Sequence, residues 1–94
     1  MTIKRPASLL PLRELWKEAF GDSDDFLDSF FGAAFSPERC RCAEEEGKLL
    51  GALYWFDVQV RQQKYAYLYA IATAKDSRGK GVCHALTEFY NKHM

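Results

Sequence analysis

The 94-residue chain is 48% hydrophobic and 15% aromatic, a composition that supports a packed core and excludes a disordered segment. Its formal net charge is zero, yet residues 1–47 carry six basic and ten acidic side chains, whereas residues 48–94 carry seven basic and three acidic ones. No apolar run approaches the roughly 20 residues of a membrane helix, no signal region follows the N-terminus, and the three cysteines are an odd count, so we expect one reduced, cytoplasmic domain without membrane association.

The N-terminal third predicts a short strand at residues 2–5 followed by two helices. Ser8 is a candidate N-cap for the first helix, Pro11 falls in its first turn, and Gly21 ends it. The buried face of this helix follows the spacing i, i+3, i+4, i+7 at Leu12, Leu15, Trp16 and Ala19.

The second helix is predicted to begin at Ser23, with Asp24 and Asp25 at its positive end, and to stop before Pro37. Its apolar stripe consists of Phe26, Leu27, Phe30, Phe31 and Ala34. We interpret this aromatic stripe as hydrophobic core.

From Arg39 the pattern changes to the period of two that indicates strands. Turns at residues 45–48 and 62–63 separate a strand with Cys40 and Cys42 on one face, a long strand at residues 49–61, and a third strand at residues 64–73. In the third strand, alternation predicts Tyr65, Tyr67, Tyr69 and Ile71 on one face and Ala66, Leu68, Ala70 and Ala72 on the other. Because both faces are apolar, we expect this strand to be central and covered on both sides.

The segment after this strand has the pattern of an anion-binding loop. Arg78, Gly79, Lys80 and Gly81 precede a helix that starts at about Val82 and turns Leu86, Phe89 and Tyr90 toward the sheet. The free N–H groups and dipole at a helix N-terminus favour a phosphate, and glycines let it approach the backbone. The spacing fits neither a Walker loop nor a dinucleotide fingerprint. No basic stripe accompanies the loop, so nucleic acid is not the expected partner.

The strand AIAT followed by Arg78, Gly81 and Cys83 resembles the coenzyme-A loop R-x-x-G-x-[G/A] of the GNAT superfamily of acyl-CoA-dependent N-acyltransferases, with cysteine at the last position. The resemblance spans essentially residues 1–94 as one partial domain. It implies an α/β (α+β) fold of order β-α-α-β-β-β-α, a mainly antiparallel sheet flanked by helices, truncated after the helix that follows the loop. It also implies that the helix pair borders a substrate groove.

The resemblance further implies acetyl-CoA as acyl donor and an amine, small molecule or peptide, as acceptor. Backbone groups of Ile71, Ala72 and Thr73 would pair with the pantetheine arm. The pyrophosphate would lie against the segment consisting of Arg78, Gly79, Lys80, Gly81, Val82, Cys83 and His84.

No catalytic residue is assigned from the sequence. The family commonly supplies its general acid as a tyrosine on a later helix, so we expect little turnover from these 94 residues alone. Tyr67, Tyr69 and Asp57 are interpreted as structural, Cys83 as a packing residue, and Cys40 with Cys42 as too few ligands for a metal site. The alternative function is a non-catalytic acyl-CoA-binding or protein-interaction module.

The strand at residues 64–73 also carries a hypothesis about partners. Between Tyr65 and Ala72 it has neither charge nor proline, the usual protections of an exposed strand edge. We therefore expect self-association through this strand unless another segment covers it.

Overall fold

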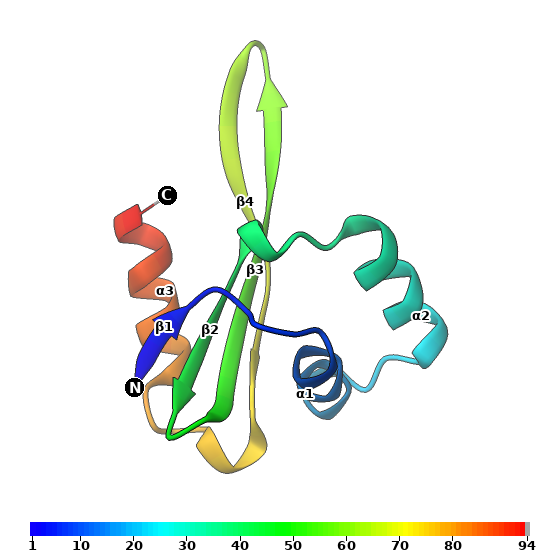
Figure 1. Cartoon of the computed structure of the whole chain (residues 1–94). Coiled ribbons are helices and arrows are strands. Elements are labelled where there is room, and N and C mark those ends of the chain that lie inside the picture. The colour runs from blue at the N-terminus through cyan, green and yellow to red at the C-terminus, as the bar shows by residue number, and fades with distance from the viewer. Residues whose placement is uncertain (94) are drawn as a thin grey trace.

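The computed structural model describes residues 1–93 as a twisted sheet with helices on both of its faces (Figure 1). The elements are β1 (Thr2–Lys4), α1 (Leu10–Phe20), α2 (Asp24–Ser29) continued by a π-helical turn (Phe30–Ala34), a 3₁₀ turn (Pro37–Arg39), β2 (Cys40–Glu45), β3 (Lys48–Val60), β4 (Gln63–Thr73), a second 3₁₀ turn (Lys75–Ser77) and α3 (Val82–His93). The strands form one antiparallel sheet in the order β1-β2-β3-β4. This confirms the predicted element order and fold class.

The sheet separates two hydrophobic clusters. On one face, α1, α2 and the π-helical turn pack an aromatic cluster around Trp16, Phe30 and Tyr54. On the other face, α3 places Val82 and Leu86 against Leu53 and Trp55. Most of the predicted inward residues are buried, namely Leu12, Leu15, Trp16, Leu27, Phe30, Phe31 and Leu86. Ala19, Phe26, Phe89 and Tyr90 are half-buried, and the exception lies in the π-helical turn. That turn closes with Phe35 N donating to Phe30 O and shifts the helical phase, so Ala34, expected to be buried, is exposed.

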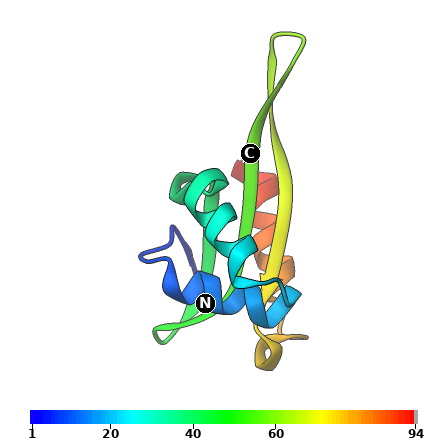
Figure 2. The same cartoon turned by 90° about the vertical axis from the view of Figure 1, so that its right-hand side faces the viewer.

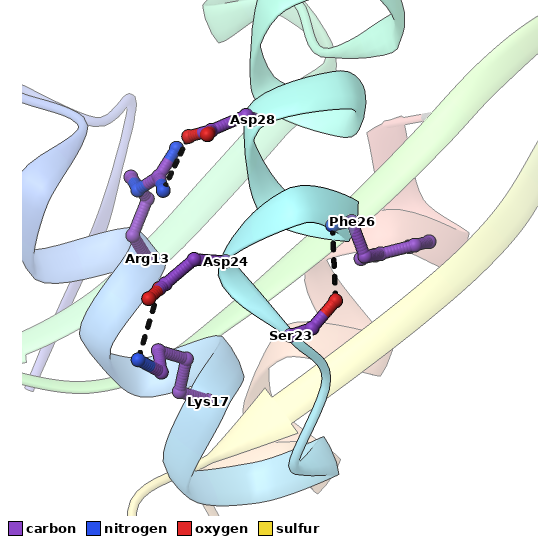
Figure 3. A network of polar contacts seen from close by, with 6 residues as sticks. All are labelled: Arg13, Lys17, Ser23, Asp24, Phe26 and Asp28. Carbon is purple, nitrogen blue, oxygen red and sulfur yellow. Dashed lines mark hydrogen bonds and ion pairs between the residues drawn. The ribbon is translucent and has the colours of Figure 1, made fainter.

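The two N-terminal helices are joined by polar contacts across their turn (Figure 3). Gly21 ends α1 in the left-handed region, and the Ser23 hydroxyl caps α2 by accepting from Phe26 N, both as predicted. Arg13 pairs with Asp28 at 2.8 Å and Lys17 with Asp24 at 2.9 Å. The prediction for Ser8 is wrong: Leu9 is the N-cap of α1, and its aliphatic side chain has no acceptor with which to cap the helix. Pro11 in the first turn leaves one fewer N–H group without a partner.

Two features of the β3–β4 hairpin differ from the prediction. The turn lies one residue earlier, at Arg61 and Gln62, which both adopt positive φ, 51° and 71°. More importantly, β4 is the edge of the sheet in the described chain and not a central strand. Its side chains Tyr65, Tyr67, Leu68 and Tyr69 are between 37% and 58% exposed.

A β-bulge at Tyr69 breaks the alternation of β4. Leu68 lies opposite Trp55, and Ala70 lies opposite Tyr54, so Tyr69 has no partner of its own in the register. As a result Tyr69, Ala70 and Ala72 all face α1 and α2, whereas Ile71 faces α3 with Ala66. The predicted grouping of Ile71 with the three tyrosines is therefore wrong.

Candidate cofactor-binding groove

The loop between β4 and α3 is held on both sides by the rest of the fold. Ala74 N donates to Leu50 O at 2.8 Å, and Ser77 N donates to Ala74 O at 2.9 Å. Lys48 from the start of β3 forms an ion pair with Asp76, and the Lys75 N–H donates to the Glu18 carboxylate of α1 at 3.2 Å. The Lys48 ammonium also holds the pKa of the Asp76 carboxyl below its usual value. The loop is thus anchored before the chain reaches its glycines.

The backbone conformation of the loop requires glycine at positions 79 and 81. Their φ angles are +82° and +80°, a region that other L residues rarely adopt. A Cβ added at either position would meet no atom within 4 Å, so both face open space. The loop therefore offers bare backbone, with room beside it, directly before a helix.

The N-terminus of α3 supplies unpaired donors and no opposing charge. The first helical return bond is Ala85 N to Gly81 O at 2.9 Å, so the N–H groups of Val82, Cys83 and His84 precede it and lack helical partners. No acidic residue lies in the first turn. Arg78 and Lys80 are exposed next to it, which makes this end of the molecule favourable for an anion.

An open groove of about 350 Å³ runs from this loop across the edge of β4 to the end of α1. Eight of the ten predicted cofactor-binding residues line it: Ile71, Thr73, Arg78, Gly79, Gly81, Val82, Cys83 and His84. Lys80 is exposed outside the lining, and Ala72 is fully buried. The sequence did not indicate Ala19, Phe20 or Ser77, which complete the walls; the first two lie more than fifty residues away along the chain, and neither they nor Ser77 carries a distinctive motif.

The register of β4 decides which main-chain groups face the groove. Because Ala74 N bonds to Leu50 O, alternation in the antiparallel ladder turns Ala72 toward β3 and leaves the N–H and C=O of Ile71 and Thr73 pointing to the open edge. The extra residue at the bulge, Tyr69, shifts the pairing of β4 by one position and so determines which of its residues point outward. Of the three strand residues implicated by resemblance, two therefore present backbone groups to the groove and Ala72 does not.

The other chemically notable residues lie outside the groove or carry structural contacts. Asp57 forms an ion pair with Arg39 at 2.8 Å, and Tyr69 stacks on Phe30 with centroids 5.6 Å apart. The exposed His84 lies 3.6 Å from Glu88. Residues 1–93 contain no group of three His, Cys, Asp or Glu side chains placed to hold a metal. No helix of the described chain is long and apolar enough to cross a membrane.

Cys40 and Cys42 share the buried face of β2, as predicted, beside the buried phenol of Tyr54. The Tyr54 hydroxyl has no hydrogen-bond partner in the described structure. Burial raises the pKa of this phenol, and the adjacent Cys42 thiol together with burial raises the pKa of the Cys40 thiol. These groups are neutral and enclosed by aromatic rings, so they belong to the core.

Comparison with known proteins agrees with this geometry. The acetyltransferase (GNAT) domain family matches residues 7–94. A crystal structure of an aminoglycoside acetyltransferase from an uncultured soil metagenomic sample superimposes with a TM-score of 0.62 at 20% identity, over 98% of this chain and 71% of that chain. No curated protein matches the sequence. The match over nearly the whole sequence, on a fold with the expected strand, loop and helix, shows that the chain belongs to the GNAT acetyltransferase family.

Proposed function

We propose that the chain binds acetyl-CoA in the groove and positions it for transfer of the acetyl group to an amine. The observation that carries the proposal is the continuity of the groove. It joins the outward-facing backbone of Ile71 and Thr73 to the glycine loop and the free donors at the start of α3. The open space at Gly79 and Gly81 fits a pyrophosphate that approaches the main chain.

Each wall of the groove has a distinct role in this proposal. The amides from Gly79 to His84 would hold the pyrophosphate, with Arg78 and Lys80 adding mobile positive charge. Ile71 and Thr73 would pair with the amide groups of the pantetheine arm as a neighbouring strand does. Acetyl-CoA supplies an activated thioester, and an N–H group at the outer edge of β4 would polarise its carbonyl.

The second candidate function is a non-catalytic acyl-CoA-binding or interaction module. It uses the same groove, so binding alone does not separate the two functions. Direct transfer also requires a base for the amine proton and an acid for the leaving thiolate, and we assign neither within residues 1–93. The release of free CoA thiol from acetyl-CoA in the presence of a panel of amines separates the two functions.

The proposal also places the protein in a reducing, cytoplasmic compartment, which the three free cysteines support.

The experiment is calorimetric titration of the chain with acetyl-CoA and with CoA. Gly81→Asp places a side chain and a carboxylate where backbone and phosphate would meet, so we expect at least a hundredfold loss of affinity. Gly47→Asp is the matched control, because Gly47 also has a positive φ and open space but lies in the β2–β3 turn. Unchanged affinity in Gly81→Asp, or an equal loss in both variants, would contradict the proposed site.

A further inference from the structure

The outer half of the β3–β4 hairpin projects beyond the helices on both sides of the sheet, as both views show (Figures 1 and 2). Its strands pair as a two-stranded ribbon from Phe56 opposite Tyr67 to Val60 opposite Gln63. Neither α1 nor α3 extends over the tip. Side chains here are therefore exposed on a ribbon whose two faces differ in chemistry.

One face of this ribbon is largely apolar. Phe56 belongs to the aromatic cluster under α1 and α2, so alternation puts Val58, Val60, Tyr65 and Tyr67 on the same side, and the bulge adds Tyr69. We call this set of five residues the tyrosine face. Their exposed fractions are 36%, 53%, 50%, 58% and 43%, respectively. The polar residue on this side is Gln63, whose side-chain oxygen accepts a hydrogen bond from the Tyr65 hydroxyl. A contiguous apolar surface of this kind on a small domain marks an interaction site.

The opposite face and the outer edge of the ribbon are less suited to binding another chain. Asp57 on the opposite face is paired with Arg39, and Gln59 and Lys64 lie beside it. At the outer edge, the Tyr90 hydroxyl of α3 donates to Ala66 O at 2.6 Å. One of the carbonyls that an added strand would need is thus already bonded. The sequence alone pointed to the edge of β4, whereas in the projecting part of the hairpin the largest uncovered apolar surface is the tyrosine face.

We propose that the tyrosine face is a self-association surface on which two copies of the chain pack face to face. A whole aromatic side chain buries roughly 150–250 Å², so three half-exposed tyrosines and two valines offer on the order of 400 Å² per copy. Two copies would bury on the order of 800–1,000 Å², which lies in the range of weak, reversible interfaces.

The charge distribution favours a second copy over a charged partner. The tyrosine face contains no ionised side chain, so a partner selected by charge has nothing to bind there, and the net charge of the chain is zero. A twofold arrangement with antiparallel ribbons sends the two tips in opposite directions. It thereby keeps Arg61 and Lys64 of one copy away from their equivalents in the other.

The test is analytical ultracentrifugation of the chain at concentrations from about 1 µM to about 1 mM, the range in which weak dimers form. We expect the average mass to rise reversibly from 10.8 kDa toward twice that value. Tyr67→Lys should weaken association at least tenfold. Gln59→Lys, which adds the same charge to the opposite face of the same ribbon, should leave it unchanged.

Three results would overturn the proposal: a monomer at every concentration, an equal effect of the two lysine substitutions, or growth to species larger than a dimer. The last would indicate open-ended pairing of strand edges. Circular dichroism confirms that each variant is folded. If Tyr67→Lys does not fold, Tyr65→Lys takes its place, since Tyr65 lies on the same face and is 50% exposed.

Discussion

Val82 occupies the space in which a side chain on Gly51 would lie. A Cβ built on Gly51 would be 2.6 Å from Val82 Cγ1 and 2.9 Å from the carbonyl oxygen of Ala72, well inside any real contact. The first residue of α3 is thus seated directly on the backbone of β3. Because the groove is formed by the start of α3 and the edge of β4, this close approach fixes the distance between its two walls.

Gly51→Ala should therefore displace the start of α3 and destabilise the fold by about 1–3 kcal/mol, the usual cost of overpacking. We also expect weaker CoA binding, since Val82 to His84 move with the helix. Gly32→Ala is the control, because a Cβ there meets nothing within 4 Å and its φ is ordinary. Urea unfolding measures the difference. Equal stability of Gly51→Ala and the parent chain would show that α3 tolerates the shift.

The sequence predicted most of the fold because its local signals agree with one another. The capping of α2 by Ser23, the ending of α1 at Gly21 and the turn at Gly47 each depend on a residue suited to that position. The glycine loop was located correctly for the same reason. The hairpin turn was misplaced because Arg61 and Gln62 adopt positive φ without being the residues that favour it.

The bulge and the groove walls depend on tertiary structure and left no local signal. Tyr69 continues a regular alternation in the sequence, so nothing distinguishes it as the extra residue of a bulge. Phe20 reaches the groove only because α1 crosses the sheet near the end of β4. The periodicity of β4 indicated two covered faces, but the described chain provides a helix over only part of each.

Phe20→Ala tests the α1 wall of the groove. The ring is 44% exposed and rests edge-on against Trp16 at 4.9 Å, so it offers an apolar surface to a bound pantetheine arm. We expect a fivefold to tenfold loss of CoA affinity, about 1–1.4 kcal/mol, and no change for adenosine 3′,5′-bisphosphate, which lacks that arm. Leu10→Ala, at the other end of α1, is the control. A parallel loss for both ligands would mean that Phe20 acts through the loop.

Tyr54→Phe should stabilise the protein. The Tyr54 hydroxyl is buried without a partner, and such a group costs about 1–3 kcal/mol, so its removal should recover about 1 kcal/mol or more. Tyr90→Phe is the contrasting variant, because it deletes a hydroxyl that donates to Ala66 O and should lose about 0.5–1.5 kcal/mol. Thermal and urea unfolding at neutral pH compare the two. Destabilisation by Tyr54→Phe would imply a bound water on that hydroxyl.

The same variant should show a characteristic dependence on alkaline pH. Burial raises the pKa of the Tyr54 phenol above its usual 10.0, so the folded protein retains this proton when the unfolded chain has lost it. Ionisation of Tyr54 therefore does not lower the free energy of unfolding below pH 10, but it lowers this free energy progressively as pH rises above 10. The advantage of Tyr54→Phe should therefore widen above pH 10. A constant difference between the two proteins would show that Tyr54 is accessible to water.

The anchoring of the loop should in turn depend on acidic pH. A hydrogen bond and the charge of Lys48 lower the pKa of Asp76 from its usual 3.8. The ion pair therefore adds stability that is fully present above pH 3.8 and is lost as pH falls through the lowered value. Asp76→Asn should be less stable than the parent chain at pH 6, and this difference should vanish toward pH 2. In a Lys48→Met background the Asp76→Asn substitution should have little effect at either pH. A difference that persists at pH 2, or is unaltered by Lys48→Met, would mean that Asp76 anchors the loop by some contact other than this ion pair.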